Sequence, residues 1–540
     1  MEFGRKLTNC RMCNSPRLYE FLNLGFLPPA DGVLSEEEIN QPEIFFPLKV
    51  CQCEDCGLTQ LVYAVKPEYL YNEKYLYESS ITETGKKHFF DMADSVCRKF
   101  NLQRNSLIVD IGSNVGVLLE GFKKNGMNIL GIDPAPRIAK IANERGIETW
   151  QEFINPNVAR RVVNEKGKAK VIGATNVFAH IDDKKGLMES LQIMLDEEGI
   201  FIIEAPYFVD LIKNLEYDTI YLDHLEYLSV KPLVNFFSKY GMDVFDVERQ
   251  EIHGKSIRVF VCWNGKKQIA ENVKNLIKLE EDKGIYNKKT LDEFARRVAE
   301  HKKIFSELIR DLKKQGKKIV GISAPAKGNT LLNYCKIDTS VIDYMTEKSL
   351  IKRGHYTPGM HIPIVGGEKQ ADYGIIFAWN FASEIIKNSK DFLKTGSFII
   401  PIPKPVIIGS INEDSLPLKI EKIDPVYSDE RGIISDLLNE KINHVGLITT
   451  EINGVRGNHY HKLSTQYSYI LSGTFEVLIA PANEPNNVKK IILNAGELIT
   501  IPPKIIHTFK AIEKAVMIDL ISESREGTGY EEDVVRIKIN

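Results

Sequence analysis

The 540-residue sequence predicts a multidomain chain in which α/β units are followed by an all-β unit. From Leu107 onwards buried strands alternate with helical segments, which is typical of parallel sheets with right-handed crossovers. After about residue 417 short alternating strands are separated by Gly, Pro and Asn turns, as in an antiparallel barrel or jelly roll. Because the chain is too long for one core, we expect four domains, 1–66, 67–265, 266–410 and 411–540.

Composition excludes several classes of partner. The net charge is −3 and basic and acidic residues are interleaved, so no nucleic-acid partner is expected. We find no signal peptide, lipidation motif or membrane-length apolar stretch, which predicts a cytoplasmic protein with no membrane partner. Disulfides are rare in that compartment, so the eight cysteines are expected to bind metal or to be buried thiols.

Four cysteines form two C-x-x-C pairs near the N-terminus, Cys10 with Cys13 and Cys53 with Cys56. Each pair supplies two thiolates from one tight turn, and four thiolates complete a tetrahedral Zn²⁺ shell. Reduced surface cysteines are the alternative, and Cys51 is an alternative ligand. A site closed by four thiolates has no open coordination position, so the predicted zinc is structural.

A glycine turn follows the strand LIVDIG at 107–112. Gly112 and Gly116 let the backbone approach a ligand closely, and Asp133 ends the next strand, where it can bind two ribose hydroxyls. The spacing D-x-G-x-x-x-G from Asp110 differs from the dinucleotide motif and favours S-adenosyl-L-methionine over another nucleotide or an empty α/β turn. With two residues that follow a later strand, the predicted cofactor set is Asp110, Gly112, Gly116, Asp133, Asn176 and His180.

The segment YDTIYLDHLEY at 217–227 packs tyrosines, a histidine and acidic residues closely together. Asp223 beside His224 offers a base with an orienting partner, and a helix cap with buried tyrosines is the alternative.

A second strand–turn–helix unit begins at 317–334, so the middle of the chain is predicted to hold two α/β layers. Further phenols that could cover a sugar or a sulfonium are Tyr71, Tyr75 and Tyr77.

Together these motifs resemble the nucleotide-sugar C-methyltransferases that build branched deoxysugars such as mycarose. The resemblance spans residues 8–405 and rests on C-x-x-C…C-x-x-CGLTQL, YLYESS, DIGSNVG, ATNVFAHI, DTIYLDHLEY, HGKSIRV, APAKGNTLLN, YTPGMHIPI and AWNFASEII, in that order. It implies a zinc domain, a Rossmann-like domain for S-adenosyl-L-methionine and a second Rossmann-like domain, with the sugar nucleotide between the lobes.

The resemblance also implies roles for single residues. His224 would remove the C3 proton of a 4-keto-6-deoxyhexose, assisted by Asp223 and Tyr77. The family usually has Glu where this chain has Asp223, and the shorter side chain weakens that assignment. The enolate carbon would then attack the sulfonium methyl, a step governed by proximity and alignment. The expected contacts to the sugar nucleotide are Tyr75, then His253, Ser256 and Arg258 at the diphosphate, and Lys327, Asn329 and His361 from the other lobe.

The C-terminal region carries a second set of candidate catalytic residues. His459 and His461 lie two apart on a strand and share a face, and His507 returns on a later strand. Residues 417–540 resemble a cupin, and RGNHYHK resembles the cupins that are 3,5-epimerases or 3,4-ketoisomerases of nucleotide-linked 4-keto sugars. One of the paired histidines would be the base and Arg456 would hold phosphate. The three histidines could instead bind a second metal, with Gln466 where metal-binding cupins place Glu.

These observations predict a bifunctional enzyme acting on a dTDP- or GDP-4-keto-6-deoxyhexose. Methylation needs the C4 ketone and leaves C3 without hydrogen, so a 3,4-keto shift is incompatible with it, whereas epimerisation at C5, or at C3 before methylation, uses the same ketone. The HxHK motif followed by Gln466 nevertheless resembles the ketoisomerases at least as much, and a non-catalytic sugar-binding or dimerising cupin is a third possibility. An O- or N-methyltransferase is the remaining alternative. We expect a homodimer.

Overall fold

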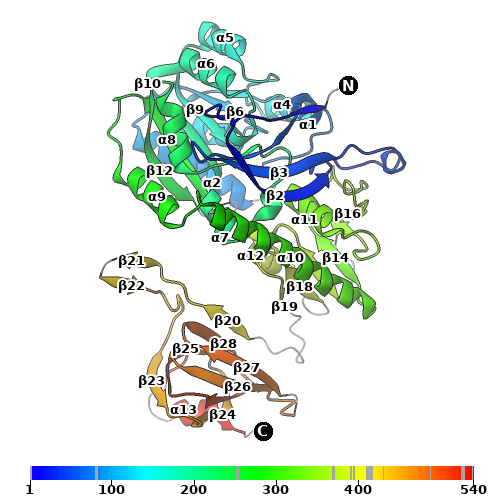
Figure 1. Ribbon diagram of the computed structural model, residues 1–540, viewed down its shortest axis with the longest axis vertical. Helices are drawn as coiled ribbons and strands as arrows, with labels where there is room; N and C mark the ends of the chain where they lie inside the picture. The colour runs from blue at the N-terminus through cyan, green and yellow to red at the C-terminus, as the bar shows by residue number, and fades with distance from the viewer. Residues whose placement is uncertain are drawn as a thin grey trace. The chain divides into compact units, whose positions relative to one another are not determined.

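The computed structural model places most of the chain in two compact units, one that reaches Ile408 and one that follows it (Figure 1). Among the described residues no helix is long and apolar enough to cross a membrane. The division of the first unit at residues 66 and 265 stays a prediction. Outside the described residues lie 1–2, 80–82, 251, 253, 368–370, 390–391, 393–395, 409–417, 430, 487, 525–528, 538 and 540.

An antiparallel sheet at the N-terminus is completed by a strand from much later in the chain. Its order is β11-β4-β3-β2, and Glu226 of β11 pairs with Gln60 of β4. Because β11 begins two residues after His224, this pairing joins the cysteine-bearing sheet to the predicted active-site loop. The elements of this region are β1 (Gly4–Lys6), β2 (Leu18–Leu27), η1 (Glu38–Asn40), β3 (Phe46–Cys53), β4 (Thr59–Leu61), β5 (Tyr63–Val65), α1 (Pro67–Leu70) and β11 (Glu226–Tyr227).

A seven-stranded sheet of order β12-β13-β10-β9-β6-β7-β8 forms the next layer. Strands β10 to β8 are mutually parallel, as the alternation predicts, whereas β13 and β12 run antiparallel at one edge. The turns after β6, β7 and β9 therefore meet at the same edge. The elements are α2 (Glu83–Lys99), β6 (Leu107–Ile111), α3 (Val117–Lys124), β7 (Asn128–Ile132), α4 (Pro136–Glu144), β8 (Thr149–Trp150), α5 (Pro156–Lys166), β9 (Ala169–Thr175), η2 (Phe178–His180), α6 (Lys184–Met194), β10 (Leu195–Pro206), α7 (Phe208–Lys213), η3 (Tyr217–Thr219), α8 (Val230–Ser238), β12 (Met242–Gln250) and β13 (Ser256–Trp263).

The second predicted α/β layer is a six-stranded sheet of order β16-β15-β14-β17-β18-β19, in which only β19 is antiparallel to its neighbour. The long helix α10 lies against β2 of the N-terminal sheet (Figure 1). The elements are α9 (Glu271–Asp282), α10 (Lys288–Lys314), β14 (Ile319–Ile322), α11 (Ala326–Cys335), β15 (Met345–Thr346), β16 (Ile364–Val365), β17 (Tyr373–Ile376), η4 (Trp379–Phe381), α12 (Ala382–Asn388), β18 (Ser397–Ile400) and β19 (Val406–Ile408).

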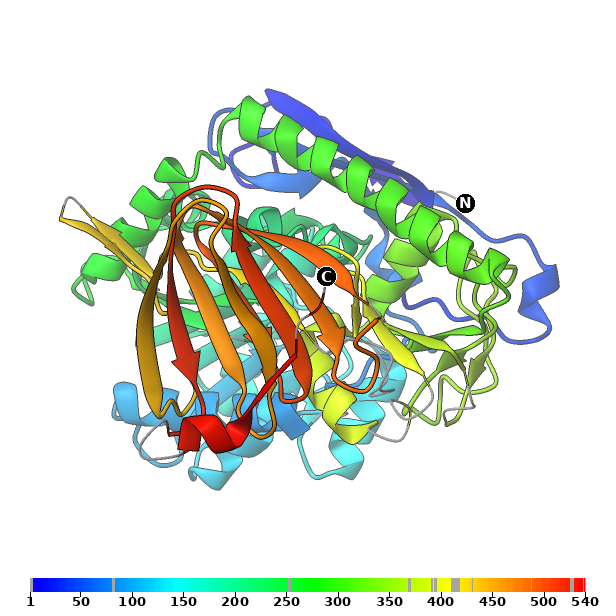
Figure 2. The same ribbon diagram turned by 90° about the horizontal axis from the view of Figure 1, so that it is seen from below.

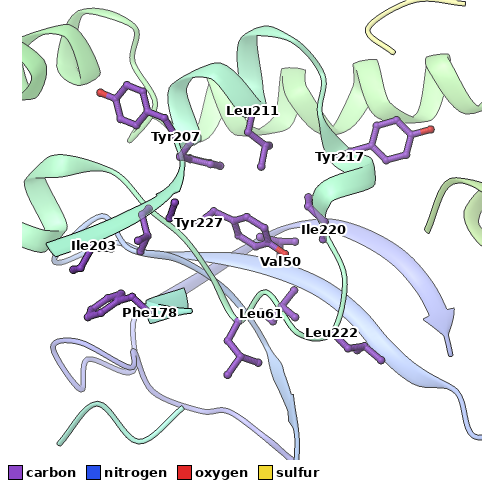
Figure 3. Close-up of a cluster of buried hydrophobic side chains, with 14 of the residues drawn as sticks. Val50, Leu61, Phe178, Ile203, Tyr207, Leu211, Tyr217, Ile220, Leu222 and Tyr227 are labelled. Carbon is purple, nitrogen blue, oxygen red and sulfur yellow. The ribbon is translucent and has the colours of Figure 1, made fainter. Parts of the chain in front are cut away.

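One apolar core joins these three parts of the first unit. Figure 3 shows Val50 and Leu61 of the N-terminal sheet beside Tyr227 and Ile220, with Phe178 of η2 and Ile203 of the seven-stranded sheet close by. The same core continues into β14 and β17, where Ile319 and Ile375 are fully buried. The three parts therefore belong to one compact unit with a shared core.

The C-terminal unit is all-β, as predicted for a jelly roll (Figure 2, orange and red strands). Two five-stranded antiparallel sheets, β20-β28-β25-β30-β23 and β27-β26-β29-β24-β31, enclose a core that includes Ile470, Phe475 and Phe509. The elements are β20 (Lys419–Lys422), β21 (Tyr427–Asp429), β22 (Gly432–Ile434), β23 (His444–Thr450), β24 (Val455–His461), β25 (Gln466–Ser472), β26 (Thr474–Pro481), β27 (Lys489–Asn494), β28 (Glu497–Ile501), β29 (Ile505–Ala511), β30 (Ala515–Ile521), α13 (Gly529–Asp533) and β31 (Val534–Arg536).

Candidate functional site

The four predicted zinc ligands lie together. Their sulfur atoms are all within 4.8 Å of one another, and Cys10 Sγ to Cys56 Sγ and Cys13 Sγ to Cys53 Sγ are each 3.5 Å apart. Four sulfurs bound to one Zn²⁺ at tetrahedral angles lie about 3.8 Å apart, so the cluster fits the ion. Cys51 is outside this cluster, and its sulfur faces Gln60 Nε2 at 3.9 Å.

The two cysteine turns share one backbone design. The amides of Asn14 and Gly57, each directly after a pair, donate at 2.9 Å to the carbonyls of Cys10 and Cys53. Both residues have positive φ, +63° and +81°. A Cβ at position 57 would lie 2.7 Å from the Tyr286 ring, so glycine is needed there for conformation and for space.

The turn between β6 and α3 has the conformation that its glycines predict, with φ of +65° at Gly112 and +78° at Gly116. A Cβ at Gly112 would lie 2.4 Å from Val177 Cγ2, so packing requires glycine there in addition to the ligand approach that the sequence predicts. Asp133 Oδ2 accepts from the Asn114 amide at 2.9 Å, and Oδ1 accepts from the Ala135 amide at 3.0 Å. Burial raises the pKa of Asp133 to about 6.

The other predicted cofactor residues lie around this turn. Burial, with a contribution from Asp133, raises the pKa of Asp110 to about 7, and Asp110 Oδ1 has no hydrogen-bond partner among the described residues. Asn176 follows β9 with φ +55°, and its amide donates to the Glu204 carbonyl at 2.7 Å. His180 Nδ1 lies 3.1 Å from the Tyr71 hydroxyl. Their direct contacts to the cofactor stay predictions.

The predicted base lies at the same edge of the sheet. His224 Nδ1 is 2.8 Å from the Thr219 carbonyl oxygen, so Nδ1 carries the proton in the neutral ring and Nε2 is the basic nitrogen. The ring packs at a tilt of 33° against Tyr221, with centroids 3.9 Å apart, and lies 5.0 Å from the His180 ring. The backbone carbonyl and the two rings thus orient the imidazole.

Asp223 is 7% exposed, and burial followed by the charge of Asp31 raises its pKa to about 7. Asp31 is a residue that the sequence did not single out, and its Oδ1 forms an ion pair of 3.2 Å with Lys352 Nζ. Nothing in the local sequence marks this pair, because its members are 321 residues apart and meet only through the fold.

The tyrosine segment is held to the cofactor turn by one side chain. Asn114 Oδ1 accepts from the Ser79 amide at 2.9 Å, and Nδ2 donates to the Tyr77 carbonyl at 3.1 Å. Tyr77 itself is 42% exposed, whereas the Tyr75 ring packs at 5.2 Å against Tyr71. The segment therefore lies beside the cofactor turn and, through Tyr71, beside His180.

The residues predicted to hold the diphosphate lie in the interior. Arg258 is 4% exposed, and its Nε donates to Glu204 Oε2 at 2.7 Å. Glu204 Oε1 also lies 2.5 Å from His88 Nε2. Ser256 is fully buried and donates to the Ile252 carbonyl at 3.1 Å, and His253 lies outside the described residues. A diphosphate would compete with Glu204 for Arg258, so these roles stay predictions.

The three residues predicted to contact the sugar nucleotide from the second lobe, Lys327, Asn329 and His361, lie against two different parts of the chain. Asn329 Nδ2 donates to the Ala30 carbonyl at 2.6 Å, and His361 Nε2 lies 2.5 Å from Glu43 Oε1, so both contact the loop between β2 and β3. Lys327 Nζ donates to Asn380 Oδ1 at 3.0 Å. Their contacts to a sugar nucleotide stay predictions.

The C-terminal histidines form a second cluster on β24 and β29. The rings of His459 and His461 are 5.0 Å apart, those of His459 and His507 are 4.6 Å apart, and one nitrogen of each lies within 4.8 Å of the others. Burial, followed by the neighbouring His459, lowers the pKa of His507 to about 3. The three nitrogens are placed where a cupin metal would bind.

His461 is also part of a hydrogen-bonded chain that the sequence did not reveal. Its Nδ1 is 2.9 Å from Asp533 Oδ2, and its Nε2 is 3.1 Å from Gln466 Oε1. Gln466 Nε2 donates to Asp519 Oδ1 at 2.9 Å, which fixes the amide orientation. The predicted phosphate ligand Arg456 is exposed and donates to the Thr449 carbonyl at 3.1 Å.

A four-cysteine zinc domain, an S-adenosyl-L-methionine turn on a parallel sheet and a cupin with three histidines define a zinc-containing, S-adenosyl-L-methionine-dependent methyltransferase fused to a cupin. Family models agree along the chain: a putative zinc binding domain matches residues 10–71, a methyltransferase domain 87–247, a C-methyltransferase C-terminal domain 251–403 and a cupin 436–529. C-methyltransferase NovU of Streptomyces niveus is 33% identical over 412 residues, which are 75% of this chain and 98% of that protein. The chain belongs to the C-methyltransferase family.

Other relatives cover smaller parts. A ubiquinone biosynthesis O-methyltransferase of Rhodopseudomonas palustris is 24% identical over 117 residues, 20% of this chain and 46% of that protein. Among solved structures, the QdtA 3,4-ketoisomerase of Thermoanaerobacterium thermosaccharolyticum is 26% identical, over 22% of this chain and 86% of that chain, with a TM-score of 0.19. The dTDP-4-dehydrorhamnose 3,5-epimerase of Sulfolobus tokodaii is 19% identical, over 22% and 76%, also with a TM-score of 0.19.

Proposed function

We propose that the chain transfers a methyl group from S-adenosyl-L-methionine to C3 of a dTDP- or GDP-linked 4-keto-6-deoxyhexose. The observation that carries this proposal is the orientation of His224. Its Nδ1–H donates to the Thr219 carbonyl, so Nε2 is the nitrogen that accepts a proton at the edge of the sheet where the cofactor turn lies. A base at this edge is needed for methylation of carbon, because a carbon-bound proton must leave. We also propose that the protein is cytoplasmic, because the thiolate ligands of the zinc site stay reduced in that compartment.

The proposed reaction uses the acidity of a hydrogen next to a ketone. His224 Nε2 takes the C3 proton, and the electron pair moves through the enolate and returns from C3 to the methyl carbon of the cofactor, whose sulfur leaves as a thioether. Asp223, with a pKa raised to about 7 by burial and Asp31, can share its proton with the developing C4 oxyanion. One proton is released for each methyl group transferred. Product NMR separates this reaction from O- or N-methylation, because only C-methylation removes a carbon-bound proton.

For the cupin we propose epimerisation of the same 4-keto sugar, at C5 or at C3 before methylation. The Asp533–His461 contact of 2.9 Å supports a histidine base, because a carboxylate on Nδ1 stabilises the protonated ring. The contact of His461 Nε2 with Gln466 Oε1 has to open before that nitrogen can either accept a proton or bind a metal, so metal-free and metal-assisted catalysis remain alternatives. A 3,4-ketoisomerase and a non-catalytic cupin are the alternatives that the next experiment separates.

In a His224→Asn background, which removes exchange by the other site, the full-length protein is expected to wash solvent deuterium into C5 or C3 of a 4-keto-6-deoxyhexose nucleotide. The further change His461→Asn should stop this exchange, because the base is lost. Proton NMR assigns the exchanged position. Conversion to a 3-keto sugar would identify a ketoisomerase, and no exchange in either protein would identify a non-catalytic cupin. In the otherwise unchanged chain, His461→Asn should spare methylation of a suitable epimer.

Truncation after residue 410 is expected to leave a methylating protein, because every methyltransferase motif lies in the first unit. We also propose that the chain is a homodimer formed through the cupin, where β23 exposes Val445 by 63% and Leu447 by 69% and β22 exposes Ile433 by 65%. Analytical ultracentrifugation should therefore show a dimer for the full chain and a monomer for the truncated one. A truncated protein that binds cofactor but methylates no 4-keto sugar would mean that the cupin completes the first site.

A further inference from the structure

A small cavity of about 20 Å³, lined by both polar and apolar residues, lies beside the predicted base and is large enough for one water molecule. His180, His224, Thr219 and Glu226 are among the residues that line it. None of the sequence motifs assigns a role to Glu226, which is 2% exposed and lies on β11. A buried carboxylate beside two histidines needs a physical explanation, because burial of an ionised group is costly unless it is paired.

Part of that explanation is an ion pair. Glu226 Oε2 lies 3.0 Å from Lys184 Nζ, which also donates to the carbonyls of Phe178 at 2.6 Å and Ile181 at 2.8 Å. Arg11, from the first cysteine turn, adds favourable charge near Glu226. Glu226 Oε2 contacts Lys184 through this ion pair only. Neither carboxylate oxygen of Glu226 nor Nε2 of His180 has a hydrogen-bond partner among the described residues, although all three atoms are buried.

We propose that a water molecule in this cavity joins Glu226 Oε1 to His180 Nε2, so that Glu226 holds His180 as its Nε2–H tautomer. The water donates to the carboxylate and accepts from Nε2–H, which leaves Nδ1 as an acceptor. The Tyr71 hydroxyl, 3.1 Å from Nδ1, then donates to His180. Glu226 is in this way a positioning residue that acts through His180.

The direction of these hydrogen bonds affects the proposed methylation. The catalytic part of the inference therefore rests on the proposed function. The Tyr71 hydroxyl also interacts with the Asp223 carboxyl. If the Tyr71 hydroxyl donates its hydrogen bond to His180, it does not donate to Asp223. The Asp223 carboxyl then stays protonated and can donate to the C4 oxygen of the sugar. The reverse direction would direct the Tyr71 proton to Asp223 and favour the ionised carboxylate.

The variant Glu226→Gln is expected to reverse the direction of the hydrogen bonds that run from residue 226 through the water to His180, while the side chain keeps its shape. The amide oxygen is expected to face Lys184, as Oε2 does now, so the amide NH₂ faces the water. The water then accepts from the amide and has both of its own hydrogens to donate, which favours donation to His180 Nε2 and the Nδ1–H tautomer of His180. We expect kcat for methyl transfer to fall about tenfold with KM for S-adenosyl-L-methionine unchanged. The matched control is Glu280→Gln, which alters another buried carboxylate whose partners are Tyr207, Tyr286 and two backbone amides.

Two measurements test the proposal directly on the full chain. Nitrogen-15 NMR of histidine-labelled protein should show His180, assigned by its loss in His180→Gln, as Nε2–H in the native protein and in the control, and as Nδ1–H in Glu226→Gln. A high-resolution crystal structure of the native protein should show one water within hydrogen-bond distance of His180 Nε2 and Glu226 Oε1. A native Nδ1–H tautomer, an unchanged tautomer in Glu226→Gln or a dry cavity would each overturn the proposal.

These readouts do not need turnover. If the native protein methylated no 4-keto sugar, the proposed function would fail while the tautomer and the water still decided this inference. If Glu226→Gln did not fold, the native tautomer and the crystal structure would decide it alone.

Discussion

Replacing His224 by asparagine is expected to lower the rate of methyl transfer by roughly 10²–10⁴-fold while leaving the affinity for S-adenosyl-L-methionine nearly intact. The asparagine amide can still donate to the Thr219 carbonyl that His224 Nδ1 contacts at 2.8 Å, so the loop should keep its shape. What is lost is the basic nitrogen that takes the C3 proton. Calorimetry measures cofactor binding, and mass spectrometry with NMR measures methylation.

The comparison variant is Asp133→Ala, which is expected to have the opposite profile. It removes the carboxylate that we predict to bind the ribose hydroxyls, and it leaves the Asn114 and Ala135 amides without their present acceptor. Cofactor affinity should fall, and methylation should recover at high cofactor concentration. Loss of cofactor affinity in His224→Asn together with native affinity in Asp133→Ala would overturn both role assignments.

The second large effect is expected from Cys53→Ser. Cys53 is fully buried and lies at the end of β3, so a missing thiolate leaves an incomplete zinc shell inside the core. Binding free energy of a structural metal is folding free energy, and the protein should lose bound zinc and melt at a markedly lower temperature. The N-terminal sheet also pairs with β11, so the loss should reach the active-site loop.

Cys51→Ser is the matched control, because Cys51 is a buried cysteine on the same strand that lies outside the sulfur cluster. It should keep one zinc ion per chain, measured by elemental analysis. Native zinc content and melting temperature in Cys53→Ser would show that the four-cysteine assignment is wrong.

The sequence alone was sufficient wherever the chemistry depends on residues that are close in the chain. Two C-x-x-C turns predicted the zinc cluster, the D-x-G-x-x-x-G turn predicted the cofactor domain, and alternating short strands predicted the all-β C-terminal unit. The zinc domain, the methyltransferase domain and the cupin are confirmed by the family models. Such motifs can be read from sequence because their geometry is set by local backbone conformation and by strand or helix period.

Only the tertiary structure decided which distant groups meet. Asp31 lies beside Lys352, Asp533 beside His461, and Glu226 beside Lys184, and no periodicity or spacing connects the members of these pairs. The same holds for Arg258, which the resemblance implied as a diphosphate ligand and which the fold places against Glu204. The physical reason is that a buried charge must find a partner within a few ångströms, and the packing of sheets from different parts of the chain determines which partner is within reach.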